Sequence, residues 1–380
     1  MNGPKLSELT GIGLLVVAVG TGWFLSPSPD DWGLHIAILD VGQADAIVVM
    51  SSSGDACVID AGHGSTAAGK IANFLTNQTK NGFAEVKQVK MGFVTHYDQD
   101  HVGGFKPLIE KGIGFKSIYD QGPSRKRAGE SVYTGYLQAV GDPNDDYGAS
   151  PVADDVEPQT FIRKRAQVGV TWNLGQAKIK CLSARGDTKG SSFDLALDPG
   201  AVEIDENPGS IALLITLGEF EFYSAGDQTS DDWKSKPDTE ESVVKSGVIV
   251  GDNDIDVLKV NHHGSDTSSG SNFVHSLRPE VAVISTKHTG HALPKMVAIQ
   301  QLVQNKTRIY ITGDGLDPEN DSFTDSSATP IDDGFQPDMK AIVNEAGDVH
   351  IFVAKDGTSY RVYANGEWAD YSAVDSANPR

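Results

Sequence analysis

Four side chains that can bind a metal ion lie within six residues of one another: His96, Asp98, Asp100 and His101. They follow an apolar run that ends in Phe93-Val94 and is typical of a buried strand. Imidazoles and carboxylates are seldom buried without a compensating charge, and a divalent metal ion is the simplest one. Gly103 and Gly104 stand directly behind them and let the backbone turn into a helix. The stretch therefore predicts a metal site; a solvated acidic loop is the alternative.

Two later clusters also place chemically able side chains at the ends of apolar runs. In Ala225-Gly226-Asp227 an aspartate follows a glycine at a predicted strand end, where a simple turn residue is the alternative. In Asn261-His262-His263-Gly264-Ser265 two histidines follow another apolar run. Adjacent side chains of an extended chain point in different directions, so only one of these histidines is expected to bind metal. The other histidine could hydrogen-bond a substrate or act in proton transfer, and the pattern does not show which of His262 and His263 takes which role.

Three aspartates close predicted strands near the start of the chain: Asp40, Asp45 and Asp60. Side chains at strand ends can gather at one rim of a sheet, so we expect these three to give the site structural support. His63 stands in a loop before a predicted helix over residues 66–77. It is a candidate substrate contact, with a solvated loop histidine as the alternative.

Other polar residues near these clusters are candidates for contact with substrate. Lys259 and Ser265 flank the histidine pair and could neutralise charge that develops on a substrate. For Lys259 a strand-face lysine without a catalytic role is the alternative. Asn207 and Ser210 are candidate substrate-binding residues, and His291, within Gly290-His291, could reach a leaving group.

The composition favours one sizeable α/β domain in an acidic chain. With 380 residues, 39% of them hydrophobic, the chain can bury a large core. Its 52 acidic and 31 basic residues give a formal charge of −21, which counts against tight non-specific binding of nucleic acid. A basic groove would reverse that argument, and residues 125–127 or 163–165 could form one. Cys57 and Cys181 are too few for a disulfide framework.

Residues 1–30 differ from the rest of the chain. An uncharged run of 15 residues, from Gly11 to Leu25, is short for a membrane-spanning helix and suits the core of a signal peptide. Because no small-x-small cleavage site precedes Ser26, an uncleaved membrane anchor is equally compatible. We therefore expect export, with the protein periplasmic, extracellular or anchored facing outward. A buried core strand is the alternative.

We expect residues 31–380 to form a single domain. Short apolar runs bounded by Gly and Asp alternate with helical segments, as in a buried sheet. Polar stretches predict surface insertions at about residues 120–165, 185–205 and 228–255.

The His-x-Asp-x-Asp-His-x-Gly-Gly pattern of residues 96–104 resembles the second motif of the metallo-β-lactamase fold, with Asp98 where histidine is commoner. The chain is also similar to the extracellular hydrolase domain of ComEC-type competence proteins, without their membrane channel. The matching segments are 39–46, 60–62, 95–104, 207–210, 226–227, 256–265 and 290–291. This resemblance implies an αββα sandwich with the site at the rim between two sheets.

The resemblance also implies a set of metal ligands. His96 and Asp98 would hold one metal ion, Asp100 and His101 with His262 the other, and Asp227 would bridge the two. The family's third-motif histidine is missing, because no histidine occurs between His101 and His262. Since zinc favours nitrogen donors and carboxylate-rich sites suit manganese, one or two ions of either metal are expected.

The resulting hypothesis is a metal-dependent hydrolase whose favoured substrate is a phosphodiester, with DNA as one candidate. Two metal ions would activate water and stabilise both oxygens of the displacement, and Asp100 would orient the attacking water. One alternative is hydrolysis of another ester or a lactam in the cell envelope. A second is a metal-poor binding module. The sequence predicts contact of residues 1–30 with a membrane and no protein partner.

Overall fold

The computed structural model describes residues 31–77, 83–124, 129–146, 162–192, 205–232, 237–247, 255–287, 293–314 and 339–374. Residues 1–30, and with them the predicted signal peptide or anchor, lie outside this part. Among the described residues, no helix has both the length and the apolar character needed to cross a membrane.

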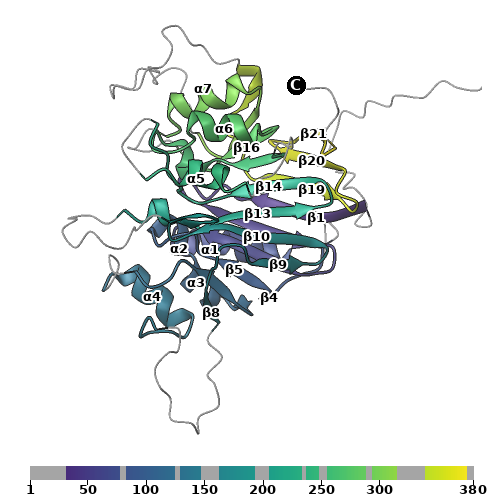
Figure 1. The fold of residues 1–380 in the computed structure, drawn as a ribbon. Helices are drawn as coiled ribbons and strands as arrows, with labels where there is room; N and C mark the ends of the chain where they lie inside the picture. The colour runs from purple at the N-terminus through teal and green to yellow at the C-terminus, as the bar shows by residue number, and fades with distance from the viewer. Residues whose placement is uncertain are drawn as a thin grey trace, which may run out of the picture.

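Two large sheets form the centre of the fold (Figure 1). The first sheet has nine strands, in spatial order β21 (Glu367–Ser372), β20 (Ser359–Ala364), β19 (Val349–Ala354), β1 (Trp32–Ile38), β2 (Ala46–Ser51), β3 (Ala56–Ala61), β5 (Met91–Phe93), β7 (Ile118–Asp120) and β8 (Arg163–Arg165). The second has ten strands, in the order β12 (Ser191–Ser192), β11 (Asp187–Thr188), β10 (Ala177–Ala184), β13 (Ala212–Leu217), β14 (Phe220–Ser224), β15 (Val257–Lys259), β16 (Val281–Ile284), β17 (Arg308–Ile311) and β18 (Ile342–Val343), with β9 (Thr171–Leu174) paired to β10. A small sheet joins β4 (Gln88–Val89) to β6 (Gly114–Phe115).

Helices cover the outer face of each sheet. The first group is α1 (Gly64–Thr76), α2 (Gln99–Val102), α3 (Phe105–Glu110) and α4 (Ser131–Ala139). The second group is α5 (Thr239–Lys245), α6 (Ser271–Leu277) and α7 (Met296–Gln304). Figure 1 shows the two groups on different sides of the strands. Three 3₁₀ turns complete the elements: η3 (Asn207–Gly209), η4 (Asn261–Gly264) and η5 (Met339–Ala341).

Three apolar layers hold these elements together. The middle layer lies between the sheets and joins Ile36 and Phe93 of the first to Ile215 and Phe222 of the second. A second layer packs α1, α3 and α4 on the first sheet, and a third packs α5, α6 and α7 on the second. Every residue of β1, β2 and β3 is buried, because both faces of these strands are covered. The predicted αββα sandwich is confirmed.

One residue of a predicted surface loop is part of the interior. Within 141–146, Gly141, Pro143 and Asn144 are exposed as a solvated loop predicts, but Asp142 is buried and accepts a hydrogen bond from Arg163 Nη1 at 2.8 Å. Arg163 is itself buried and also pairs with Asp120 at 2.5 Å and Asp145 at 2.6 Å. Arg163 therefore cannot contribute to a basic groove, since its charge is already neutralised by three carboxylates. Residues 125–127 lie outside the described part.

Candidate metal centre

Strand ends from both sheets meet to form the site. The loop after β5 carries Thr95 and His96 and leads into α2, which carries Asp100 and His101. Asp227 follows β14, and the two adjacent histidines follow β15 in η4. Each sheet thus supplies part of the cluster.

Glycines allow these loops to approach one another. A Cβ on Gly104 would lie 1.9 Å from Ala61 O, so only glycine lets α2 and α3 pack against the end of β3. Gly226 has φ +52°, and a Cβ there would lie 2.3 Å from Thr95 Oγ1. Because of that glycine, Asp227 can sit beside the loop that carries His96.

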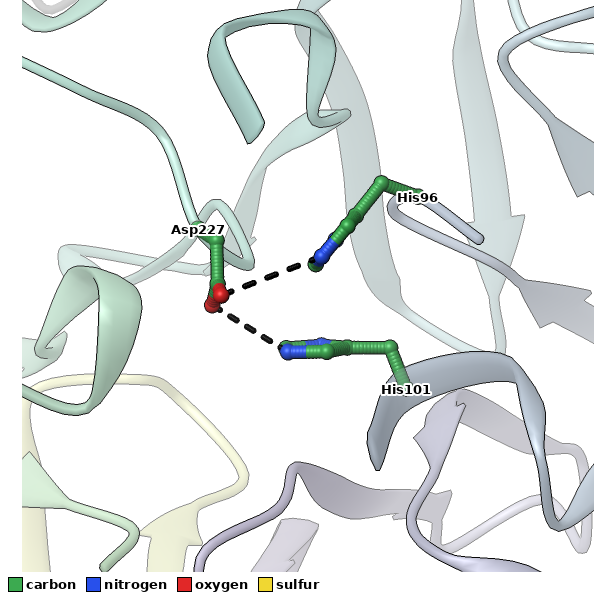
Figure 2. Close-up of side chains that lie close together, drawn as sticks. All are labelled: His96, His101 and Asp227. Atoms are coloured by element: carbon green, nitrogen blue, oxygen red, sulfur yellow. Dashed lines mark ion pairs between the residues drawn. The ribbon is translucent and has the colours of Figure 1, made fainter. Parts of the chain in front are cut away.

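Asp227 is the centre of the cluster. Figure 2 shows its carboxylate facing the rings of His96 and His101, which come from the opposite sheet. The side chain of Asp227 is only 4% exposed. Its two oxygens face two different groups of ligands, which we call the Oδ2 half and the Oδ1 half.

The Oδ2 half contains His96, Asp98 and His262 around Asp227 Oδ2. His96 Nε2 lies 3.8 Å from Asp227 Oδ2 and 3.6 Å from Asp98 Oδ2. His262 Nε2 lies 3.5 Å from the same Asp227 oxygen. This half therefore offers two nitrogens and two oxygens.

The Oδ1 half contains Asp100, His101 and His263 around Asp227 Oδ1. The Nε2 atoms of His101 and His263 lie 3.2 and 3.7 Å from Asp227 Oδ1. Asp100 Oδ2 lies 3.2 Å from His263 Nε2 and 3.8 Å from His101 Nε2. This half also offers two nitrogens and two oxygens.

Both adjacent histidines face the cluster, although only one of them was expected to bind metal because adjacent side chains of an extended chain diverge. His262 has φ +48° and His263 has φ +53°, and both residues are left-handed. Two left-handed residues in sequence abolish the alternation of an extended chain, which was the basis of that expectation. The structure also places His263, rather than His262, beside Asp100 and His101. His262 instead lies in the half for which the sequence supplied only one nitrogen donor, that of His96.

Each of the four imidazoles is held at Nδ1. His101 Nδ1 donates to Asp60 Oδ2 at 2.8 Å, and His263 Nδ1 donates to Ser285 O at 2.7 Å. The remaining two rings are held by hydroxyls: His262 by Thr267 Oγ1 at 2.6 Å, and His96 by Thr95 Oγ1 at 3.2 Å and Ser210 Oγ at 3.3 Å. An N–H at Nδ1 leaves Nε2 with a lone pair, which is the tautomer of a metal ligand.

The remaining atoms fit a metal ion. The Nε2 atoms of His96, His101 and His263 and the Oδ1 atom of Asp227 are buried and make no hydrogen bond. Unsatisfied buried polar atoms are costly, and a bound cation would supply the partner that these four lack. Ligands bound at ~2.0–2.1 Å around a tetrahedral zinc ion lie about 3.3–3.4 Å apart, close to the 3.2–3.8 Å separations here. The ligand atoms of His96, His101 and Asp227 all lie within 4.8 Å of one another, and so do those of Asp100, His101 and His263, so each of these two groups fits a divalent cation.

Electrostatics distinguishes the two halves. Burial lowers the pKa of His96 and of His262, which leaves both rings neutral. Burial also acts to lower the pKa of His101, but the carboxylates of Asp227, Asp100 and Asp60 outweigh it and raise that pKa well above its usual range. The pKa of His263 is raised in the same way, chiefly by Asp227 and Asp100. The carboxylates are thus concentrated around the Oδ1 half.

Solved structures of the metallo-β-lactamase fold are similar to this chain. YhfI from Bacillus subtilis has 12% identity over 73% of this chain and 96% of its own, with a TM-score of 0.39. A metallo-β-lactamase from Cronobacter sakazakii has 16% identity over 59% and 76%, with a TM-score of 0.33. A variant of the CmlA β-hydroxylase has 13% identity over 75% and 53%, with a TM-score of 0.42. At such values these similarities concern the fold alone.

The other two comparisons gave nothing. No protein-family model matches the chain, and no curated protein matches it.

Four of the predicted substrate and support residues lie behind the ligands. Asp60 accepts hydrogen bonds from Thr95 N, Thr95 Oγ1 and His101 Nδ1. Ser210 Oγ lies 3.3 Å from His96 Nδ1 and accepts from Asp227 N at 3.2 Å. Asn207 Nδ2 lies 3.4 Å from His262 Nε2, and Ser265 is buried with its Oγ 3.0 Å from Thr267 Oγ1. Asp60, Ser210 and Ser265 are thus placed as supports for ligands, whereas Asn207 contacts His262 at Nε2, the nitrogen that faces Asp227.

Lys259 is not placed to meet a substrate. It is 1% exposed, and its Nζ lies 2.8 Å from Oδ1 of Asp45, which is equally buried. A lysine with its charge neutralised inside the protein cannot also stabilise charge on a ligand in solvent. The predicted catalytic role of Lys259 is therefore corrected to an internal one.

Three other predicted residues lie away from the four histidines or outside the described part. Asp40 Oδ1 accepts from Gly42 N at 3.2 Å, so it supports the turn between β1 and β2. His63 is exposed at the start of α1, and among the described residues no contact joins it to the cluster. His291 falls outside the described residues.

Sequence reasoning missed several supporting residues. Thr95 donates to Asp60 Oδ2 and lies against His96 Nδ1; its place next to His96 was the only signal. Ser285 acts through its backbone carbonyl, which no side-chain pattern can indicate. Glu240 is buried and accepts from Asn261 Nδ2, Ser269 N and Gly270 N, and burial raises its pKa to about 8. It lies in the segment predicted to be a surface insertion, where nothing suggested an internal role.

Proposed function

We propose that this protein is a metal-dependent hydrolase. One observation carries the proposal: all four imidazoles are anchored at Nδ1 and turn Nε2 toward the two oxygens of Asp227. A structural cluster of buried histidines has no need of this common orientation. Two nitrogens and two oxygens in each half suit zinc or manganese.

The exposure of the ligands supports an open face for substrate. The side chains of Asp98, Asp100 and His262 are 31, 27 and 24% exposed, whereas those of His96, His101 and His263 are 1% exposed or less. A substrate would therefore approach along Asp98 and Asp100.

The side chains of the cluster have separate roles in the proposed reaction. Divalent ions, when bound, lower the pKa of water and stabilise negative charge on the reacting oxygens. Asp227 would hold both halves together with one carboxylate. Asp100, at the open face, would orient the attacking water and accept its proton. Burial acts to raise the pKa of Asp100, but His101 and His263 outweigh it and hold that pKa below its usual range, so the carboxylate is ionised at neutral pH and can accept a hydrogen bond from the water.

A phosphodiester is the substrate that we favour, and a nearby cavity bears on its size. The cavity has a volume of about 600 Å³ and contains the side chains of Asp40, Lys70, Lys287, Asp314 and Glu345 in its lining. None of the four histidines lines it, and one of its two lysines, Lys70, already donates to Asp40 O. Its three carboxylates, together with the formal charge of −21 on the chain, would repel the many phosphates of a polymer. This acidic balance supports a small phosphodiester over duplex DNA.

The test is hydrolysis of bis(p-nitrophenyl) phosphate, single-stranded DNA and a phosphorylcholine ester by the full-length protein. The protein is stripped of metal and then titrated with zinc or manganese. We expect metal-dependent turnover of the small diester, reduced by about 10²–10⁴-fold in Asp100→Asn. The control is Asp55→Asn, which removes an acid at the other end of β3, paired with Lys90 at 2.6 Å, and should leave turnover unchanged.

Each result has a clear meaning. Turnover that survives the chelator, or that is equal in Asp100→Asn and wild type, would refute the hydrolase mechanism. Turnover of the phosphorylcholine ester or of DNA, but not of the small diester, would keep the enzyme and reject our substrate. Failure to bind metal would favour a binding module.

Location remains a proposal from the sequence alone. The run from Gly11 to Leu25 supports export and contact of residues 1–30 with a membrane. Protease protection in intact cells, with a cytoplasmic protein as control, would test it.

A further inference from the structure

A buried ion pair ties the two sheets together directly behind the site. Asp45 belongs to the loop between β1 and β2 of the first sheet, and Lys259 ends β15 of the second. Both are 1% exposed, and Asp45 Oδ1 lies 2.8 Å from Lys259 Nζ. Lys259 also donates to Val260 O at 2.9 Å. The pair therefore fixes the spacing of the sheets at the rim where their ligands meet.

Asp45 contacts the Oδ1 half at two points, and Lys259 neutralises its charge. Asp45 N donates to Asp100 O at 3.1 Å, so its backbone holds the turn that presents Asp100. Asp45 Oδ1 lies 3.7 Å from His263 Nδ1, on the ring edge that donates to Ser285 O. A negative charge at that edge favours the N–H at Nδ1 and keeps the lone pair on Nε2. Among the described residues, no ion pair or hydrogen bond joins Asp45 or Lys259 to His96 or His262.

Stability alone does not require such a pair. Replacing both members of a buried ion pair by neutral residues of similar volume is often neutral or stabilising, whereas removing only one leaves an uncompensated charge. The position of this pair points to the ligands instead.

We propose that Asp45 and Lys259 are positioning residues for the Oδ1 half of the metal centre. They hold Asp100 and His263 at metal-binding distance before an ion arrives. This inference rests on the proposed metal centre but does not depend on which substrate is cleaved.

The experiment compares metal binding by full-length wild type, D45N/K259M and D45L/K259M, using isothermal titration with zinc and with manganese. In His263→Ala, the metal equivalent that is lost or weakened is the one bound by the Oδ1 half. In both double variants we expect that equivalent to bind about 10–100-fold more weakly, as is typical when a group supporting a ligand is lost. The other equivalent and the thermal midpoint of the metal-free protein should stay near their wild-type values.

The control is D55N/K90M, which makes the same exchange at an ion pair of 2.6 Å that is partly exposed. It should bind both equivalents as wild type does. The single variant Lys259→Met should destabilise the protein, because it leaves Asp45 buried without its partner.

Four outcomes would overturn the inference: unchanged affinity in the double variants, equal weakening of both equivalents, unfolding of both double variants, or no metal binding by wild type. Only the last of these also removes the proposed function. Metal binding without hydrolysis would refute the proposed function and leave this inference to be judged on affinity.

Discussion

Within the described part of the chain, histidines gather in two places, and only one of these has carboxylates arranged around the ring nitrogens. The cluster between the sheets contains four histidines, and its Nε2 atoms face carboxylates. The other place is the pair His35 and His350, on the outer face of the first sheet. There His35 stacks on Phe352 with ring centroids 4.0 Å apart and is bordered by Phe74 and Phe83.

The difference is one of neighbours rather than burial. Burial lowers the pKa of His35, and the nearby His350 lowers it further. The rings of His101 and His263 are just as buried, but acidic neighbours raise the pKa of each. Carboxylates at the open nitrogen, and an anchor at the other, are what separate a candidate metal ligand from a core histidine.

The strongest way to break this contrast is to remove the central carboxylate. Asp227→Asn keeps the shape of the side chain but takes away the negative charge that both halves share. We expect loss of stoichiometric metal binding and of metal-dependent turnover, with folding retained. Metal content of the purified protein measures the first, and circular dichroism checks the second. An Asp227→Asn protein that still binds two ions would show that the halves are independent of this residue.

A smaller effect on metal affinity is expected for side chains that hydrogen-bond the ligands. Among these, a carboxylate should matter more than a hydroxyl. Asp60→Asn weakens the anchor of His101 and disturbs Thr95, so metal affinity should fall about 10–100-fold. Ser210→Ala should cost less, since Thr95 Oγ1 still lies 3.2 Å from His96 Nδ1. Competition with a chromophoric chelator measures both affinities. Equal losses in the two variants would contradict the view that carboxylates matter more.

Much of the site could be predicted from the sequence because its ligands are close together in the chain. His96, Asp98, Asp100 and His101 occupy one strand end and one turn of helix, so local spacing alone brings them together. The short apolar runs predicted buried strands, and the resemblance of the motifs to the metallo-β-lactamase fold implied the αββα sandwich.

The rest depends on contacts that local patterns do not record. The two left-handed residues at His262 and His263 are not indicated by their side chains, which normally avoid that conformation. The pairing of Asp45 with Lys259 joins residues from different sheets, and each alone resembled an ordinary strand-end residue. Arg163 looked like part of a basic patch, because its three acidic partners are distant in sequence or in a loop predicted to be exposed.

The smallest expected effect concerns His35 and His350, which lie outside the candidate metal centre. The pKa of His35 is lowered well below 6.5 in the folded protein, so the unfolded chain takes up a proton first as the pH falls. The resulting stability is complete above about pH 6.5 and is lost below it, at about 1.4 kcal/mol per pH unit for one fully titrating group. His35→Phe removes this contribution, so urea unfolding of the metal-free variant should depend less on pH between about 6.5 and 5 than wild type does. The histidines of the candidate metal centre are present in both proteins, and their contributions cancel in the comparison. His350 contacts His35 at 3.2 Å, so the change in slope reports the pair. An identical slope in the two proteins would mean that His35 takes up a proton as readily when folded, and the contrast between the two clusters would then not rest on their neighbours.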